Sequence, residues 1–189
     1  MAARGMPTWH GGIQFRSRLE ARHALFFDEL HLKWEYETQG FASDGQPYLP
    51  DFAVFAATGT IWIEIKPSWD ADPDGIEKFR RFAIQRPMPS RAALLVGPPS
   101  ATATALVIGG SIDADDPALG PWEDDSQTWR WCPAGQHFDL AQPGMFGSRL
   151  VEDGCEHIRD NDGELKIIRA ATVANSAKFL KGPDPDGRR

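Results

Sequence analysis

The chain of 189 residues has little of several things, and each shortage excludes a class of protein. It contains only two cysteines, which is too few for a disulfide framework, so we expect a reducing compartment. Its apolar runs are far shorter than the roughly 20 residues that a membrane-spanning helix needs. The first twelve residues also lack the apolar stretch of a signal peptide. These shortages predict a cytoplasmic protein with no membrane association.

An excess of positive charge, which is common in nucleic-acid-binding proteins, is also missing, because the net charge is −7. The acidity is uneven along the chain. Residues 1–110 hold 11 Lys and Arg against 12 Asp and Glu, whereas residues 111–189 hold 9 against 15. The nearly neutral first part includes a basic cluster of Lys78, Arg80, Arg81, Arg86 and Arg91. Such a cluster can contact phosphates or form a solvated helix face.

The pattern of apolar residues predicts both helices and strands. Helices are predicted from Ser17, with Ser17 as N-cap and Glu20 in the capping-box position, and over 73–85. Strands are predicted over 33–37, 47–55, 60–66, 92–96 and 102–109. We interpret the first dozen residues as irregular, and residues 164–174 as a strand passing into a helix that reaches Leu180. Helices and strands that follow one another in this way predict an α/β fold.

Two of the predicted strands carry ionisable groups where a strand usually buries carbon. One contains Tyr48-Leu49-Pro50-Asp51-Phe52, and the other contains Ile61-Trp62-Ile63-Glu64-Ile65-Lys66. In the second strand the isoleucines share one face, and Glu64 and Lys66 project from the other with Cα atoms about 6.5 Å apart. A short turn joins the two strands, so Asp51 can lie beside Glu64 and both carboxylates can reach one cation.

These residue types are a minimal set for hydrolysing a phosphodiester with a metal ion. Asp51, Glu64 and the backbone carbonyl of Ile65 are hard oxygen ligands of the kind that Mg²⁺ prefers. The ion lowers the pKa of its bound water, and Lys66 can orient that water or stabilise the transition state. Glu20 supplies a third carboxylate. As alternatives, Glu64 and Lys66 form an ion pair on a solvent-facing strand, and Glu20 only caps its helix.

The order of the Ser-x-Leu-Glu helix, Tyr-Leu-Pro-Asp-Phe and Gly-Thr-Ile-Trp-Ile-Glu-Ile-Lys resembles the PD-(D/E)xK nuclease superfamily. The resemblance covers about residues 15–97 and is similar in detail to small phage and bacterial members and to the endonuclease subunit of certain transposases. It implies a restriction-endonuclease-like core over residues 13–110, with a mixed central β-sheet flanked by helices. A loop-rich C-terminal extension over 111–180 and a disordered tail over 181–189 are expected to follow.

The resemblance also implies a function, a metal-dependent deoxyribonuclease. Its active site would consist of Glu20, Asp51, Glu64 and Lys66, with Mg²⁺ or Mn²⁺ held by Asp51, Glu64, Glu20 and the Ile65 carbonyl. The implied partner is DNA, with a homodimer or a larger phage or bacterial assembly as further options. A catalytically silent DNA-binding or assembly module and an RNA-processing nuclease stay open as alternatives on the same core.

Five basic residues are candidate contacts to DNA phosphates. They are Arg16, Arg18, Arg22, Lys78 and Arg81, and solvated helix residues are the alternative interpretation. The second half of the chain offers a separate candidate metal site at Cys132, His137, Cys155 and His157. Two cysteines and two histidines can hold a structural Zn²⁺ tetrahedrally. However, the spacing departs from the usual Cys-x2-Cys, and buried, unligated cysteines near Trp129 and Trp131 are the alternative.

Overall fold

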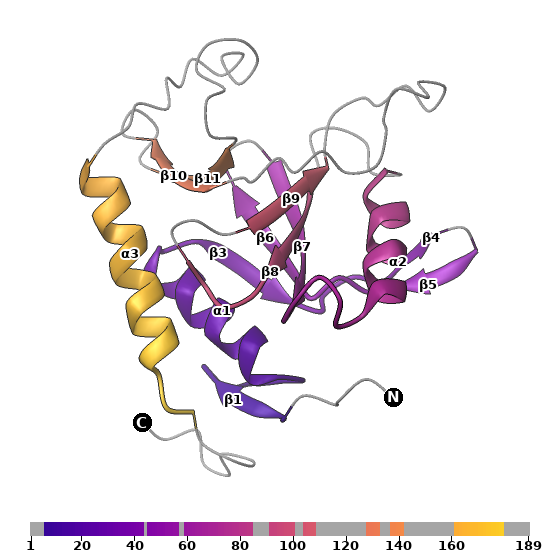
Figure 1. Ribbon diagram of the computed structural model, residues 1–189, viewed down its shortest axis with the longest axis horizontal. Helices are drawn as coiled ribbons and strands as arrows, with labels where there is room; N and C mark the ends of the chain where they lie inside the picture. The colour runs from indigo at the N-terminus through magenta and orange to yellow at the C-terminus, as the bar shows by residue number, and fades with distance from the viewer. Residues whose placement is uncertain are drawn as a thin grey trace.

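The computed structural model describes residues 6–43, 45–56, 59–84, 91–100, 104–108, 128–132, 137–141 and 161–179. These residues form a mixed α/β structure around a mixed central sheet (Figure 1), which confirms the predicted α/β class. The elements are β1 (Thr8–His10), β2 (Ile13–Phe15), α1 (Arg18–Glu29), β3 (Lys33–Tyr36), β4 (Phe41–Ser43), β5 (Gln46–Tyr48), β6 (Phe52–Ala56), β7 (Gly59–Lys66), α2 (Pro73–Ile84), β8 (Arg91–Val96), β9 (Thr104–Ile108), β10 (Thr128–Cys132), β11 (His137–Ala141) and α3 (Asn161–Ser176).

The central sheet has five strands in the order β3-β6-β7-β8-β9. Strand β6 is antiparallel to both β3 and β7, β7 and β8 are parallel, and β9 returns antiparallel to β8. A parallel pair needs a crossover connection, and α2 lies in the segment that connects β7 to β8. The sequence around Glu64 and Lys66 therefore lies in the middle of the sheet, with neighbours on both sides.

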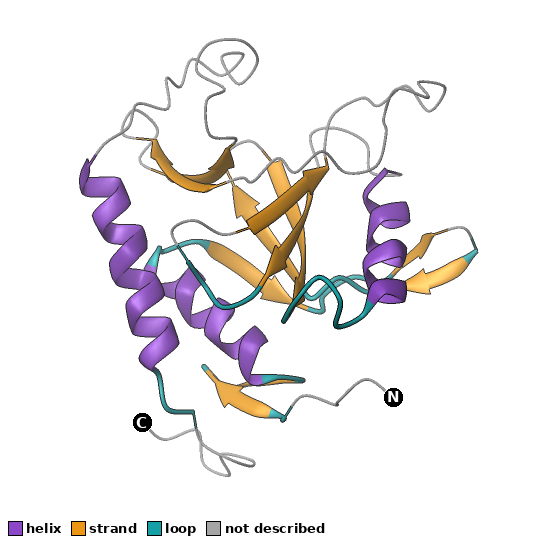
Figure 2. Cartoon of the chain, viewed as in Figure 1, coloured by secondary structure: helices purple, strands orange, loops and turns teal. Residues whose placement is uncertain are grey.

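Helices cover both faces of this sheet, with α1 and α3 on one side and α2 on the other (Figure 2). The alternation of side chains along β7 explains the arrangement. Ile61, Ile63 and Ile65 join the core cluster beneath α1 and α3. Trp62 packs on the opposite face, against the cluster that contains Phe79 and Phe82 of α2. The predicted division of β7 into two faces is confirmed.

Helix α3 belongs to the same core as α1, although it lies within the segment predicted as a C-terminal extension. Its buried residues are Ile167, Ala170, Ala171 and Ala174. They recur at the spacing of one helix face, and their small side chains let the two helices approach closely. The strand predicted at the beginning of 164–174 is wrong, because this segment is helical throughout.

The predicted start of α1 is confirmed. Ser17 is the N-cap, and its hydroxyl accepts a hydrogen bond from the backbone N–H of Glu20. The second predicted helix corresponds to α2, whose first residue is Pro73. Proline suits this position because the first helical N–H has no partner within the helix.

Two further predictions about strands are wrong. The strand predicted over 47–55 is divided into β5, which pairs with β4, and β6, which lies in the central sheet. Pro50 lies between them, and proline cannot donate to a strand ladder. The first dozen residues, interpreted as irregular, contain β1 and the turn that joins it to β2, with φ of 58° at Gly11 and 81° at Gly12. The break before β6 matters most, because it places Asp51 at the end of the central sheet, directly before β6.

The β10–β11 hairpin was not predicted, since no turn signal between its strands stood out from the surrounding glycine-rich sequence. In the part of the chain that the structure describes, no helix combines the length and the apolar character that crossing a membrane would require.

Candidate active site

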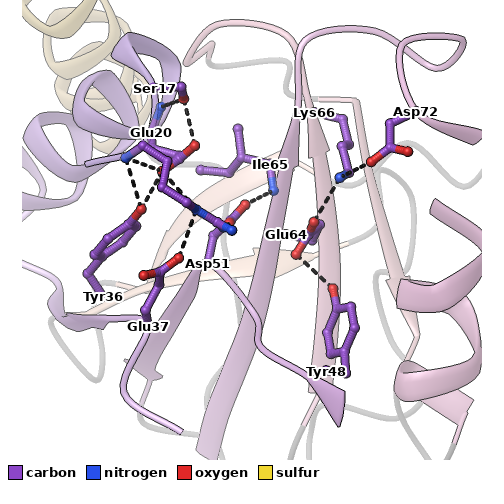
Figure 3. A network of polar contacts seen from close by, with 11 residues as sticks. Ser17, Glu20, Tyr36, Glu37, Tyr48, Asp51, Glu64, Ile65, Lys66 and Asp72 are labelled. Atoms are coloured by element: carbon purple, nitrogen blue, oxygen red, sulfur yellow. Dashed lines mark hydrogen bonds and ion pairs between the residues drawn. The ribbon is translucent and has the colours of Figure 1, made fainter. Parts of the chain in front are cut away.

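The four predicted site residues lie in one region at the end of β7 (Figure 3). Asp51 precedes β6, and its neighbour Phe52 pairs with Ile63, the residue before Glu64. Asp51 Oδ2 accepts a 2.7 Å hydrogen bond from the backbone N–H of Ile65. This bond fixes the Asp51 carboxylate against β7, between the carboxylates of Glu20 and Glu64.

Asp51 and Glu64 are both buried, with 2% and 7% of their surface exposed. Burial, and then repulsion from the Glu64 and Glu20 carboxylates, raises the pKa of Asp51 well above its usual range, although Arg16 and the Ile65 N–H oppose this shift. Burial also raises the pKa of Glu64, against the opposing effects of Lys66 and Tyr48. Carboxylates this close, removed from water, form a site where an added cation is strongly favoured.

Lys66 is held between two carboxylates. Its Nζ lies 3.0 Å from Glu64 Oε1 and 2.7 Å from Asp72 Oδ2. Partial burial disfavours its charged form, but Glu64 and Asp72 outweigh that effect and raise the pKa of Lys66. The Glu64–Lys66 ion pair is therefore present, as one alternative expected, but it is not solvent-facing, because the two side chains are only 9% and 14% exposed.

The two tyrosines of the chain both donate to proposed site carboxylates. Tyr48 Oη lies 2.7 Å from Glu64 Oε2, and Tyr36 Oη lies 2.5 Å from Glu20 Oε2. Burial, together with the neighbouring carboxylate, raises the pKa of each tyrosine, so each hydroxyl keeps its proton and stays a donor. Sequence reasoning missed both roles. Its only signal for Tyr48 was the position of that residue three places before Asp51.

Glu20 both caps its helix and joins the carboxylate region. Its Oε1 accepts a 2.7 Å hydrogen bond from Ser17 Oγ, and its Oε2 accepts a 3.1 Å bond from the backbone N–H of Arg16. The side chain is nevertheless buried, bonded to Tyr36 and near enough to Asp51 to raise the pKa of that residue. The Glu20 carboxylate can therefore cap α1 and belong to the candidate active site at the same time.

Arg16, a predicted phosphate contact, instead binds carboxylates of this region. Its Nη2 donates to Asp51 Oδ1, and its Nε lies 2.8 Å from Glu37 Oε1. Sequence reasoning did not find Glu37. Its backbone has φ of 47°, in the left-handed region, and its N–H donates a 2.9 Å bond to the Asp51 carbonyl. Non-glycine residues held in this conformation concentrate at functional sites.

Within the described ranges, the other predicted phosphate contacts form no ion pair with Glu20, Asp51 or Glu64. Arg18 and Lys78 are exposed, whereas Arg22 is half-buried, with an Nε that has no hydrogen-bond partner within the described ranges. Arg81 Nε pairs with Glu77 Oε1 at 3.1 Å, which fits the solvated helix face of the alternative interpretation.

Part of the candidate zinc site falls on the β10–β11 hairpin, where Cys132 and His137 are directly opposite each other in the strand register. Cys155 and His157 lie outside the described residues. The zinc site therefore stays a prediction.

Among the residues that the structure places, no three His, Cys, Asp or Glu side chains are grouped as metal ligands. The cations of Arg16 and Lys66 contact the carboxylates instead. Comparison with protein-family models, curated proteins and solved structures gives no match, so the function must be argued from this geometry.

Proposed function

We propose that the protein is a metal-dependent nuclease that hydrolyses DNA phosphodiester bonds, built on a restriction-endonuclease-like core. One observation carries the proposal: two buried carboxylates, Asp51 and Glu64, lie next to each other at the end of a central strand with the ammonium of Lys66 in contact. A site that only stabilises the fold has no need to bury two repelling acids.

The donor set fits a hard divalent cation such as Mg²⁺ or Mn²⁺. Asp51, Glu64 and the Ile65 carbonyl would hold it, with Glu20 beside them, because oxygen ligands with surplus negative charge suit such ions. The bound ion would supply an activated water and would offset charge on the phosphate. Tyr48 and the Ile65 N–H fix the orientation of Glu64 and Asp51 beforehand.

Lys66 would act on the reacting groups rather than on the metal. The contacts to Glu64 and Asp72 keep its Nζ protonated and hold it beside the carboxylates. An ammonium in this position can donate a hydrogen bond to the attacking water or to a phosphate oxygen that gains charge. Because water is largely excluded around Lys66, each such bond is stronger than it would be in bulk solvent.

The order of elements supports the proposed core. A helix (α1), three antiparallel strands (β3, β6 and β7), a crossover helix (α2) and a parallel strand (β8) occur in this order, with β4 and β5 inserted between β3 and β6, and helices flank both faces of the sheet. The four residues carried over from the resemblance come from three separate segments of the sequence, yet they lie in one region. Their convergence is what an active site requires and what an accidental motif match would lack.

A substrate panel tests the proposal. Purified protein is incubated with circular, linear, branched and single-stranded DNA and with RNA, each with Mg²⁺, Mn²⁺, Ca²⁺ or EDTA, and both binding and cleavage are measured. We expect cleavage of DNA that depends on the metal, with Ca²⁺ supporting binding better than cutting. Preferential cleavage of RNA would identify the RNA-processing alternative. Binding of DNA without any cleavage would favour the catalytically silent module.

A further inference from the structure

Arg16 is an exposed arginine that binds a buried carboxylate. Its guanidinium donates to Asp51 Oδ1, lies 2.8 Å from Glu37 Oε1, and is 4.0 Å from Glu20 Oε2. The Arg16 side chain is 58% exposed and that of Asp51 only 3%. The guanidinium therefore stands between the buried carboxylate and the solvent.

This position makes Arg16 a competitor for any cation that approaches Asp51. The backbone N–H of Ile65 occupies Asp51 Oδ2, and because it belongs to β7 it cannot move away. Oδ1 has no such backbone donor and is the more available oxygen for an incoming ion, and the guanidinium of Arg16 already contacts it. Two cations at one carboxylate oxygen repel each other strongly where little water screens them.

We propose that Arg16 is an internal counter-ion of Asp51 that a divalent cation must displace, an inference that rests on the proposed metal-dependent function. Without metal, the guanidinium compensates the charge of the buried carboxylates. When metal binds, the long, exposed side chain turns outward, where its planar fork matches a phosphate group. The apparent metal affinity is then reduced according to the fraction of molecules in which Arg16 holds Asp51.

Glu37 strengthens this interpretation. A guanidinium that only awaited DNA would need no acidic partners, yet Glu37 is held in a left-handed backbone conformation with its carboxylate on Arg16 Nε. The N–H of Glu37 also bonds the Asp51 carbonyl, so the two acids that hold Arg16 are fixed to each other. Glu37 therefore favours the state in which Arg16 covers Asp51.

Binding of Mn²⁺ to the metal-free protein, measured by calorimetry and by the loss of the free-ion electron paramagnetic resonance signal, tests the proposal without any need for catalysis. Arg16→Gln should bind Mn²⁺ about tenfold more tightly than wild type, because the competitor is gone. Arg18→Gln is the matched control, since it removes the same charge from an exposed residue two positions away. Its affinity should change less than about twofold, because exposed charges are screened.

Glu37→Gln is the second variant, for the case in which Arg16→Gln does not fold. It removes the negative charge of the outer partner of Arg16, and we expect Mn²⁺ to bind about threefold more tightly. Unchanged or weaker Mn²⁺ binding in Arg16→Gln would overturn the proposal that metal displaces Arg16, and would leave the proposed function intact. If only Glu37→Gln folds, the same result in that variant has the same meaning. If neither wild type nor the variants bound Mn²⁺ at all, both the displacement and the proposed nuclease would fail.

Discussion

Lys66 and Asp72 form an ion pair that lies directly over Gly75. Lys66 Nζ is 2.7 Å from Asp72 Oδ2, and Asp72 Oδ1 accepts a 3.1 Å hydrogen bond from the backbone N–H of Gly75 at the start of α2. A Cβ at position 75 would lie 2.0 Å from Asp72 Oδ2 and 2.8 Å from Lys66 Nζ. Because Gly75 has no side chain, the Asp72 carboxylate can cap α2 and bind Lys66 at the same time.

Gly75→Ala should therefore fail to stabilise the protein. Replacing a helical glycine with alanine usually gains about 1 kcal/mol, but here Asp72 has to rotate away, and the lost cap costs about 1 kcal/mol. We expect an unchanged or lower free energy of unfolding in urea. Asp72→Asn is the control, because asparagine caps equally well and only the ion pair and hydrogen bond to Lys66 are lost. A Gly75→Ala protein more stable by 1 kcal/mol would show that the ion pair relocates freely.

Glu20→Gln separates the two uses of Glu20. Glutamine can still bond to Ser17, Tyr36 and the Arg16 N–H, so the free energy of unfolding should change little. The loss of the negative charge beside Asp51 should reduce DNA cleavage tenfold or more, which is roughly 1.4 kcal/mol in the barrier. Ser17→Ala should do the reverse, costing about 1 kcal/mol of stability with normal cleavage. Wild-type turnover in Glu20→Gln would make Glu20 a helix cap alone.

The burial of His23 should make the free energy of unfolding decrease at low pH. It is completely buried on α1, and its ring Nε2 is 3.1 Å from the Gly97 carbonyl oxygen. Burial lowers the pKa of His23 to about 4, despite the opposing effect of that hydrogen bond. Below the unfolded pKa of about 6.5, the histidine binds a proton more readily in the unfolded chain than in the folded protein. The contribution of His23 to the free energy of unfolding is therefore complete above pH 6.5 and is lost as the pH falls toward 4.

The full loss should be about 3 kcal/mol, of which about 2 kcal/mol should appear between pH 7 and pH 4.5. The measurement is the free energy of unfolding in urea at pH 7 and pH 4.5, for wild type and for His23→Gln, whose amide can still donate to Gly97. Asp51 and Glu64 act in the opposite direction because their pKa values are raised in the folded state. They are common to both proteins, so the difference between the two pH dependences isolates His23. Parallel pH dependences would contradict the buried, neutral histidine.

The parts of the fold that the sequence predicted are those set by local pattern. Alternating isoleucines predicted β7 and its two faces, and Ser17 marked the beginning of α1 because capping depends on near neighbours. The division of β5 from β6 was missed, since an apolar run with one proline reads as a single strand. The docking of α3 on α1 was also beyond prediction, because an alanine-rich stripe does not specify which distant surface it will cover.

The site shows the same division between local and distant information. Asp51, Glu64 and Lys66 were predicted from the order of motifs, but their partners were not. Tyr48 reaches Glu64 across 16 residues and Arg16 reaches Asp51 across 35. Such contacts depend on how strands and helices pack. Periodicity along the chain carries no information about them.

The central claim is that Glu64 is part of a metal-dependent cleavage site, and DNA cleavage in Mg²⁺ by wild type, Glu64→Gln and Glu77→Gln tests it most directly. Glu77 is a matched control, since it is a carboxylate on α2 that pairs with Arg80 and Arg81 away from the site. We expect Glu64→Gln to cut at least about 100-fold more slowly, roughly 2.7 kcal/mol in the barrier, and Glu77→Gln to cut like wild type. Equal cleavage by all three proteins, or cleavage that persists in EDTA, would contradict the account.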